Sequence, residues 1–98
     1  MHVEQGGEGS DLLVLLHGLG ATGAVWSPMC ADAGRRWHGR WLAMDLPGHG
    51  RSDTQDSYAI GQYAASVART ILPHVDRAGR LVILGHSLGG LIGLALPT

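Results

Sequence analysis

The stretch Leu81–Gly93, LVILGHSLGGLIG, decides how the chain is interpreted. Four aliphatic residues stop at the motif GHSLG (residues 85–89), and a second apolar run follows it. An aliphatic run before a glycine-rich turn and a helical pattern is typical of a buried strand that leads into a helix. In a G-x-S-x-G turn the serine is strained, and the flanking glycines avoid clashes with the neighbouring strand and helix. We therefore expect Ser87 to project from a strand end, where a suitable base would make it a nucleophile.

Two other interpretations of this motif stay open on these residues alone. Some glycine-rich turns between a strand and a helix carry a serine incidentally, and others bind phosphate. A Walker-type phosphate loop needs a lysine, whereas all seven basic residues of this chain are arginines. The apolar run before the motif and the helical pattern after it favour the nucleophile interpretation.

Two further apolar runs precede this motif and predict two more strands. A strand that is buried on both faces has a continuous apolar sequence, and strands are expected at 12–17, 41–45 and 81–85. Met1–Gln5 is expected to end an edge strand, which the turn at 6–9 joins to the first of these. The chain holds no further strand to cover the one at 81–85, so we expect an open apolar edge and a tendency to aggregate or to fold only partly.

Helical patterns separate the predicted strands. The expected helices run from a Ser27 cap and Pro28 through Met29, Ala33 and Trp37, from an Asp56 or Ser57 cap to a stop at Pro73, and from Leu88 to Pro97. In the second of these, apolar residues recur at helical spacing over 58–72. Alternating strands and helices predict an α/β fold with a parallel sheet, right-handed crossovers and helices on both faces.

The composition indicates a globular protein without a polyanionic partner. Of the 98 residues, 45% are hydrophobic and 15% charged, which is too apolar for disorder, and 16 glycines interrupt the apolar runs that a membrane span would need. The net charge of −1, without a basic cluster, argues against binding to nucleic acid or a membrane. One cysteine, Cys30, and an N-terminus without a secretory signal predict a cytoplasmic location. The six histidines lack metal-ligand spacing, so no metal site is expected.

Two other turns are predicted at the same edge of the sheet as Ser87. In a parallel sheet, functional groups gather at the carboxyl ends of the strands. The turn HGLG (17–20) would supply a backbone N–H to an oxyanion hole, with the N–H of Leu88 as its partner, although a plain turn is the alternative. The turn DLPGHGRSD (45–53) is expected to be architectural, with side chains bonded to their own backbone.

The motifs LLHGLG, DLPGHGRSD and LVILGHSLGG, in this order, resemble the N-terminal half of the α/β-hydrolase fold. They are similar to the branch that holds esterases, lactonases, carbon–carbon bond hydrolases and cofactor-free haloperoxidases. The resemblance implies that Ser87 is the nucleophile, that the N–H groups of Leu19 and Leu88 form the oxyanion hole, and that the strand at 12–17 lies between the other two. It also implies a small-molecule substrate, such as an ester or lactone, and no cofactor.

The family's chain order places the catalytic acid and histidine after the serine, yet this sequence ends at Thr98. No substitute is expected within the chain, because His17 and His49 have roles in their turns and His86 is expected to point to the other side of the turn. Residues 1–98 are therefore expected to be the N-terminal part of a single, incomplete α/β-hydrolase domain that is inactive alone. A further possibility is that the short chain is itself the product, from a frameshift or an incomplete gene, with no activity of its own. A non-catalytic ligand-binding protein is the alternative. The substrate and the oligomeric state are not predicted.

Overall fold

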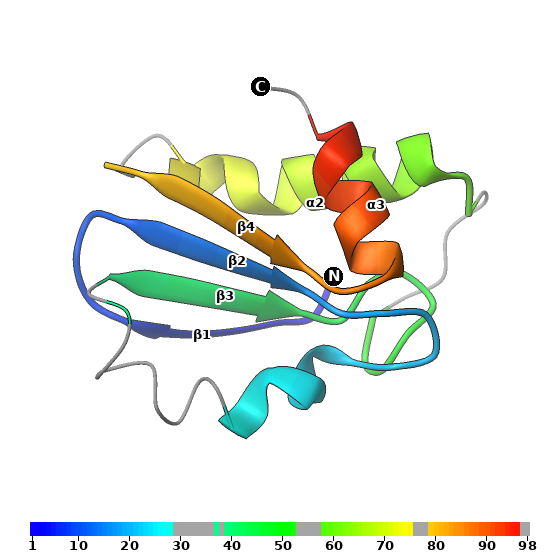
Figure 1. Cartoon of the computed structure of the whole chain (residues 1–98), viewed down its shortest axis with the longest axis horizontal. Coiled ribbons are helices and arrows are strands. Elements are labelled where there is room, and N and C mark those ends of the chain that lie inside the picture. Colours follow the sequence, from blue (N-terminus) through cyan, green and yellow to red (C-terminus); the bar gives the residue numbers. More distant parts are fainter. Residues whose placement is uncertain (29–36, 38, 53–57, 76–78, 97–98) are drawn as a thin grey trace.

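Four strands form one mixed sheet in the order β1-β3-β2-β4 (Figure 1). The strands are β1 (Val3–Gly7), β2 (Leu12–Leu16), β3 (Arg40–Met44) and β4 (Leu81–Gly85). Strand β2 lies in the middle and pairs in parallel with both β3 and β4. The three predicted parallel strands and their order are therefore confirmed. This computed structural model describes residues 1–28, 37, 39–52, 58–75 and 79–96.

Strand β1 is the expected edge strand, but it covers Val3–Gly7 where Met1–Gln5 was expected. It runs antiparallel to β3, so the sheet is mixed, and it continues into the glycines that were expected to form a turn. Gly6 pairs with Trp41, and a Cβ at Gly6 would lie only 2.5 Å from the indole ring. The small residue therefore belongs to the strand because it makes room for Trp41.

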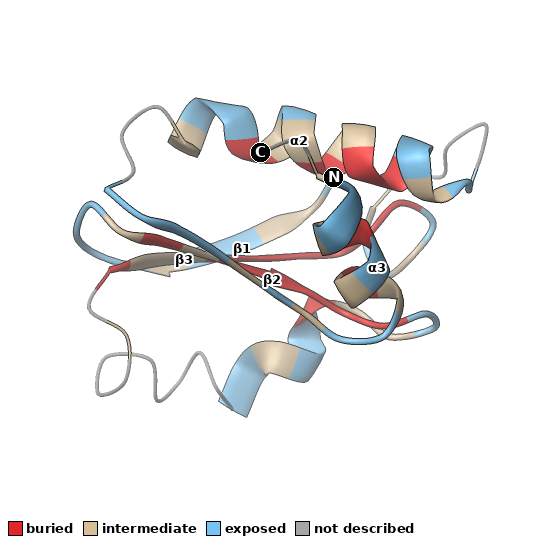
Figure 2. Cartoon of the chain, turned by 45° about the horizontal axis from the view of Figure 1, so that its top comes forward, coloured by how far each residue is buried: buried red, intermediate tan, exposed pale blue. Residues whose placement is uncertain are grey.

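The helices lie on both faces of the sheet, as expected (Figure 1). The helices α2 (Ile60–Val75) and α3 (Leu88–Ala95) cover one face, and the short 3-10 helix η1 (Gly23–Trp26) lies on the other. The buried stripe of α2 faces the sheet (Figure 2) and consists of Tyr63, Ala64, Val67 and Ile71.

Two predicted helix boundaries need correction. Pro73 does not stop α2, which continues to Val75, because a proline in the last turn removes only one late backbone hydrogen bond. Ser27 is not an N-cap, since its backbone is already helical at φ −53° and ψ −44°. The cap on this side of the sheet is Thr22, whose side chain accepts a hydrogen bond from the backbone N–H of Ala24. The helical pattern predicted over 29–36 and the caps at 56 and 57 lie outside the described residues.

The core lies between the sheet and the two longer helices. Its fully buried members from β2, β3 and the turn after β3 are Leu12, Val14, Leu16, Leu42, Met44 and Leu46. Ile92 of α3 belongs to the same core. Burial of these side chains supplies most of the driving force for folding this unit. No helix in the described part of the chain is long and apolar enough to cross a membrane.

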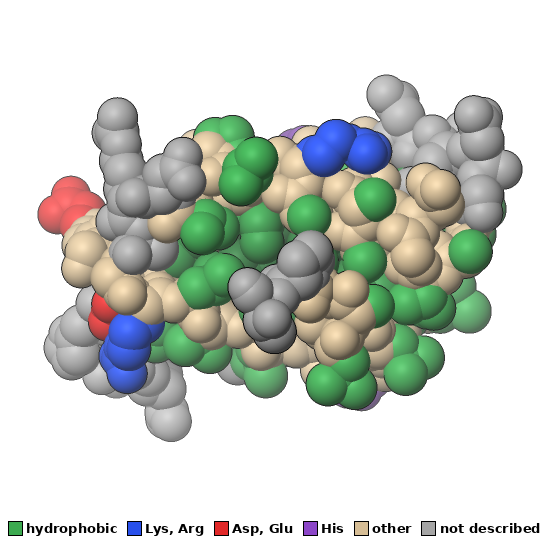
Figure 3. Space-filling view, turned by 90° about the horizontal axis from the view of Figure 1, so that it is seen from above, with side chains coloured by type: hydrophobic (Ala, Val, Ile, Leu, Met, Phe, Trp, Pro, Cys, Tyr) green, Lys and Arg blue, Asp and Glu red, His purple; other side chains and the backbone are tan. Residues whose placement is uncertain are grey.

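Strand β4 and the two helices beside it leave a large apolar surface exposed. Leu81 is 42% exposed, and Val82 and Leu84 are each 38% exposed, although all three lie in a strand. Hydrophobic side chains also gather over α2 and α3 (Figure 3), where Leu72 and Leu94 are exposed. The expected open apolar edge is therefore present, while the predicted aggregation remains a prediction.

Candidate active site

The turn between β4 and α3 has the strained geometry that the sequence predicts. Ser87 has φ 56° and ψ −113°, and it is the one non-glycine residue with positive φ in the described ranges. Such a conformation costs on the order of 1–3 kcal/mol and persists where the surroundings impose it. A Cβ at Gly85 would collide with the carbonyl of Gly89, and a Cβ at Gly89 would collide with the carbonyl of Leu16 on β2. Both flanking glycines are therefore sterically required.

Ser87 lies on a hollow of about 370 Å³ at the carboxyl edge of the sheet. The hollow is lined by Gly18, Leu19, Ala21, Val25, Trp26, His86 and Ser87, so the loop after β2 and the turn after β4 form its walls. Ser87 is exposed, and its side chain makes no capping hydrogen bond to α3. The hydroxyl is thus free to meet a molecule that enters the hollow.

The two residues with the predicted oxyanion donors, Leu19 and Leu88, both lie near Ser87. Leu19 lines the hollow, and Leu88 is the first residue of α3, where backbone N–H groups have no acceptor within the helix. In the part of the chain that the structure describes, neither backbone N–H takes part in a hydrogen bond. Two unused N–H groups beside a serine, one of them at a helix N-terminus, suit a developing negative charge.

His86 departs from expectation, because it lines the same hollow as Ser87. Its imidazole lies against Gly18, where an added Cβ would be 3.2 Å from His86 Nδ1 and 3.5 Å from Ser87 Cβ. The absence of a side chain at Gly18 makes room for the ring on this side of the turn. No hydrogen bond joins His86 to Ser87 in the described residues.

His17, at the start of the loop after β2, is fully buried, and both of its ring nitrogens contact backbone groups. Its Nε2 accepts a hydrogen bond from the N–H of Leu46 at 2.9 Å, and its Nδ1 lies 2.7 Å from the carbonyl oxygen of Gly18. Burial lowers the pKa of His17 below 6.5, the bond to Gly18 opposes this, and the nearby His49 lowers it further. The ring is therefore held neutral, which supports the expectation that it has a role in its turn.

His49 is the third histidine at this edge. Its ring centroid lies 5.1 Å from that of His17, and its Nδ1 lies 3.1 Å from the carbonyl oxygen of Pro47. Among the described residues, no hydrogen bond joins His49 to Ser87. His17 and His49 thus both contact backbone groups, His17 those of two different turns and His49 one of its own turn.

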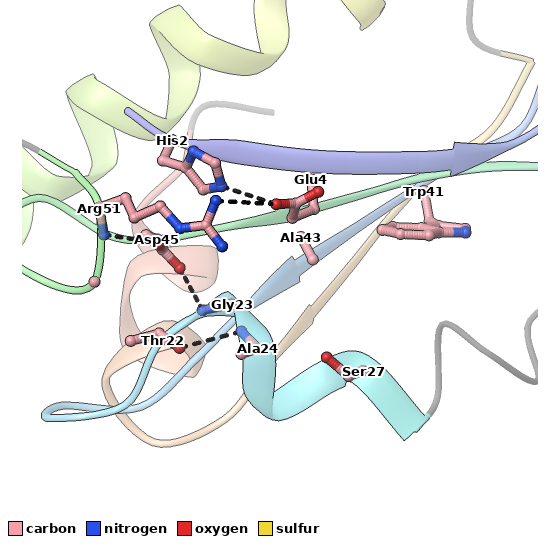
Figure 4. Close-up of a pocket in the computed structure, with 11 residues that line it drawn as sticks. His2, Glu4, Thr22, Gly23, Ala24, Ser27, Trp41, Ala43, Asp45 and Arg51 are labelled. Carbon is pink, nitrogen blue, oxygen red and sulfur yellow. Dashed lines mark hydrogen bonds and ion pairs between the residues drawn. The ribbon is translucent and has the colours of Figure 1, made fainter.

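The turn after β3 is architectural, as predicted. The buried carboxylate of Asp45 accepts hydrogen bonds from the N–H of Gly23 at 2.7 Å and of Arg51 at 2.9 Å (Figure 4). Burial acts to raise the pKa of Asp45, but these two bonds, together with the nearby His2 and His17, keep the pKa below the ordinary value of 3.8. The hydroxyl of Ser52 donates to the Asp45 carbonyl, which closes the turn on itself.

A second hollow, of about 390 Å³, lies between η1 and the β1–β3 side of the sheet (Figure 4). Within it, Glu4 pairs with His2 at 2.9 Å and with Arg51 at 3.8 Å. Its lining does not include Ser87. No group of three or more His, Cys, Asp or Glu side chains among the described residues is placed to hold a metal ion.

The loop after β2 carries a signal that the sequence interpretation missed. Residues 18–23, GLGATG, match the dinucleotide fingerprint G-x-G-x-x-G after a strand. In that fingerprint a pyrophosphate binds at a helix N-terminus. Here the segment leads into the four-residue 3-10 helix η1, and the carboxylate of Asp45 already accepts the N–H of Gly23. A fixed carboxylate at that place repels a phosphate, so the spacing does not indicate a nucleotide site.

Most of this chain is similar in sequence to a region of known esterases. A pimeloyl-[acyl-carrier protein] methyl ester esterase of Aeromonas salmonicida is 38% identical over 96 residues, which cover 96% of this chain and 34% of the relative. The esterase of the same name from Vibrio cholerae is 37% identical over 86 residues, covering 88% of this chain and 30% of the relative. The chain therefore spans about a third of the length of these relatives.

Solved structures of a lactonase and an esterase share the fold. The N-acyl homoserine lactonase AidH, complexed with N-butanoyl homoserine, matches with a TM-score of 0.80 at 28% identity, over 95% of this chain and 34% of that one. An esterase of Thermogutta terrifontis matches with a TM-score of 0.80 at 25% identity, over 96% of this chain and 34% of that one. The model of the alpha/beta hydrolase family matches residues 13–97. With the strand order and the strained turn at Ser87, this match shows that the chain belongs to the alpha/beta hydrolase family.

Proposed function

We propose that this chain carries the nucleophile and the oxyanion hole of a serine hydrolase that acts on an ester, a lactone or a similar small acyl compound. The observation that carries the proposal is the strained Ser87, which lies in a hollow beside two unused backbone N–H groups. The names of the relatives support the substrate class, since they describe a methyl ester esterase and an N-acyl homoserine lactonase. Residues 1–98 are proposed to form part of one hydrolase domain.

The proposed reaction is acyl transfer through a covalent intermediate. The Ser87 oxygen attacks the substrate carbonyl, its proton passes to a base, and the N–H groups of Leu19 and Leu88 stabilise the resulting oxyanion. The alcohol then leaves with a proton from that base, and water hydrolyses the acyl-serine in the same manner. One oxyanion donor typically contributes about 10²–10³ in rate, so the two N–H groups are a large part of the proposed catalysis.

We propose that the base is a histidine in the part of the hydrolase that these 98 residues do not span, since the chain covers about a third of its relatives. His17 and His49 contact backbone groups, and His86 lines the hollow without a hydrogen bond to Ser87 in the described ranges. A serine hydroxyl without its base loses on the order of 10⁴–10⁶ in rate even where the oxyanion hole survives. We therefore propose that the 98-residue chain alone hydrolyses esters no faster than background.

Hydrolysis of p-nitrophenyl butyrate tests this proposal. The purified chain is compared with Ser87→Ala and His86→Ala, and all three are expected to match the background rate. Turnover that disappears in both variants would show that His86 is a local base and would refute the external base. Turnover by the chain that persists in Ser87→Ala would remove Ser87 from the mechanism.

A further inference from the structure

We propose that His17 is a positioning residue that sets the direction of the Leu19 N–H, and that the end of β3 supports it in this task. This inference rests on the proposed function only where it takes that N–H to be an oxyanion donor. Its basis is the pair of hydrogen bonds that the buried imidazole makes, one to Gly18 and one to Leu46.

The partners of the ring fix its tautomer. The backbone N–H of Leu46 can only donate, so His17 Nε2, 2.9 Å away, is the unprotonated acceptor. The carbonyl of Gly18 can only accept, so His17 Nδ1, 2.7 Å away, carries the proton and donates it. Both ring nitrogens are therefore used, and the ring is clamped between the loop after β2 and the turn after β3.

The bond to Gly18 acts on Leu19 through the peptide plane. The carbonyl of Gly18 and the N–H of Leu19 belong to one planar peptide unit, and no peptide bond in the described residues is cis. In a trans unit the C=O and N–H point in opposite directions, so fixing the oxygen also fixes the N–H. The same carbonyl accepts the N–H of Ala21 at 3.1 Å, which closes the turn. A carbonyl that accepts hydrogen bonds also polarises its peptide and makes the N–H a stronger donor.

The other end of the loop over 17–23, at Gly23, is also held by the turn after β3. Asp45, next to Leu46 in the chain, accepts the N–H of Gly23 at 2.7 Å. Two consecutive residues after β3 thus hold both ends of the loop over 17–23. A loop tied in this way keeps its donor in place before a substrate arrives, which is the condition for effective oxyanion stabilisation.

The first test is the protonation of the wild-type ring, observed by long-range ¹H–¹⁵N NMR at pH 7.5. We expect a protonated Nδ1 and an unprotonated Nε2 on His17. A proton on Nε2, or on both nitrogens, would overturn the proposal whatever the variants do. Because this measurement needs no catalysis, it holds even if Ser87 proves unreactive.

The second test separates the two bonds with two amides. His17→Asn places a donor near the Nδ1 position, whereas His17→Gln reaches the Nε2 position and accepts from Leu46. The backbone amide resonance of Leu19 is expected to move more in the glutamine variant than in the asparagine variant, with Leu88 little changed in both. Equal shifts of Leu19 in the two variants would refute a specific role for the Gly18 bond. Spectra of Val82→Lys, a change on the exposed edge strand, show which shifts come from self-association.

The third readout is covalent labelling of Ser87 by a fluorophosphonate, with imidazole added as an external base. A displaced donor typically costs up to about 10²-fold, so labelling of the glutamine variant should be roughly 10- to 100-fold slower than that of the asparagine variant. Equal rates would overturn the positioning role. If the wild type showed the expected tautomer but no labelling, the proposed function would fail while the link from His17 to Leu19 stood.

Discussion

Replacing Gly89 with alanine tests the close approach of the serine turn to the sheet. The new Cβ would collide with the carbonyl oxygen of Leu16, a backbone atom of β2 that cannot rotate away. Overpacking costs about 1–3 kcal/mol, and since no side chain can yield we expect about 3 kcal/mol. Gly89 lies in α3, so alanine also returns about 1 kcal/mol of helix propensity. The net loss of stability is therefore about 2 kcal/mol.

Gly90→Ala is the matched control, one residue further along the same helix. Its Cβ would meet nothing closer than the carbonyl oxygen of Gly85, at 3.5 Å, so only the helix propensity changes and the variant should gain about 1 kcal/mol. A difference of about 3 kcal/mol between the two variants corresponds to roughly 12–24 °C in Tm for a domain of this size. Thermal unfolding followed by far-UV circular dichroism measures both. Melting of the two variants at the same temperature would refute the steric argument.

Three further predictions concern pH, the Asp45 turn and the exposed edge. The free energy of unfolding should be highest above pH 6.5 and fall as the pH drops toward the lowered pKa of His17. The reason is that His17 binds a proton at a higher pH in the unfolded chain than in the folded one. A urea midpoint that is equal at pH 7.5 and 5.5 would contradict this. Asp45→Ala leaves two backbone N–H groups unpaired and should cost roughly 2–4 kcal/mol in urea unfolding, whereas the exposed Glu4→Ala should cost less than about 1 kcal/mol; equal losses would argue against the Asp45 role. Val82→Lys should reduce self-association in sedimentation experiments, and unchanged association would show that β4 is not the contact.

The parts of the fold that could be predicted from the sequence are those where a short local pattern allows one structure. The continuous aliphatic run at Leu12–Leu16 has no polar face, so burial on both sides was the only consistent interpretation. The strained conformation of Ser87 was also predictable, because glycines on both sides are needed only where backbone approaches backbone.

The features that were missed depend on contacts between distant segments. Gly6 was expected in a turn, yet it lies in β1 because the Trp41 ring occupies the space beside it. The position of His86 in the hollow depends on the missing side chain at Gly18, a residue far away in the chain. The contacts of His17 were missed for another reason. The predicted strand order brings the turns after β2 and β3 to one edge of the sheet, but local spacing does not show that Leu46 donates to the His17 ring.

The central claim is that Ser87 is a nucleophile whose base is not among these 98 residues. Its most direct test is mass spectrometry of the chain after reaction with a fluorophosphonate. Added imidazole supplies the base from solution, so a single adduct on Ser87 that forms with imidazole, and at most slowly without it, is predicted. Ser87→Ala should show no adduct at that peptide. Labelling spread over other serines, or no labelling of Ser87 with imidazole present, would contradict the nucleophile, and equally fast labelling without imidazole would contradict the external base.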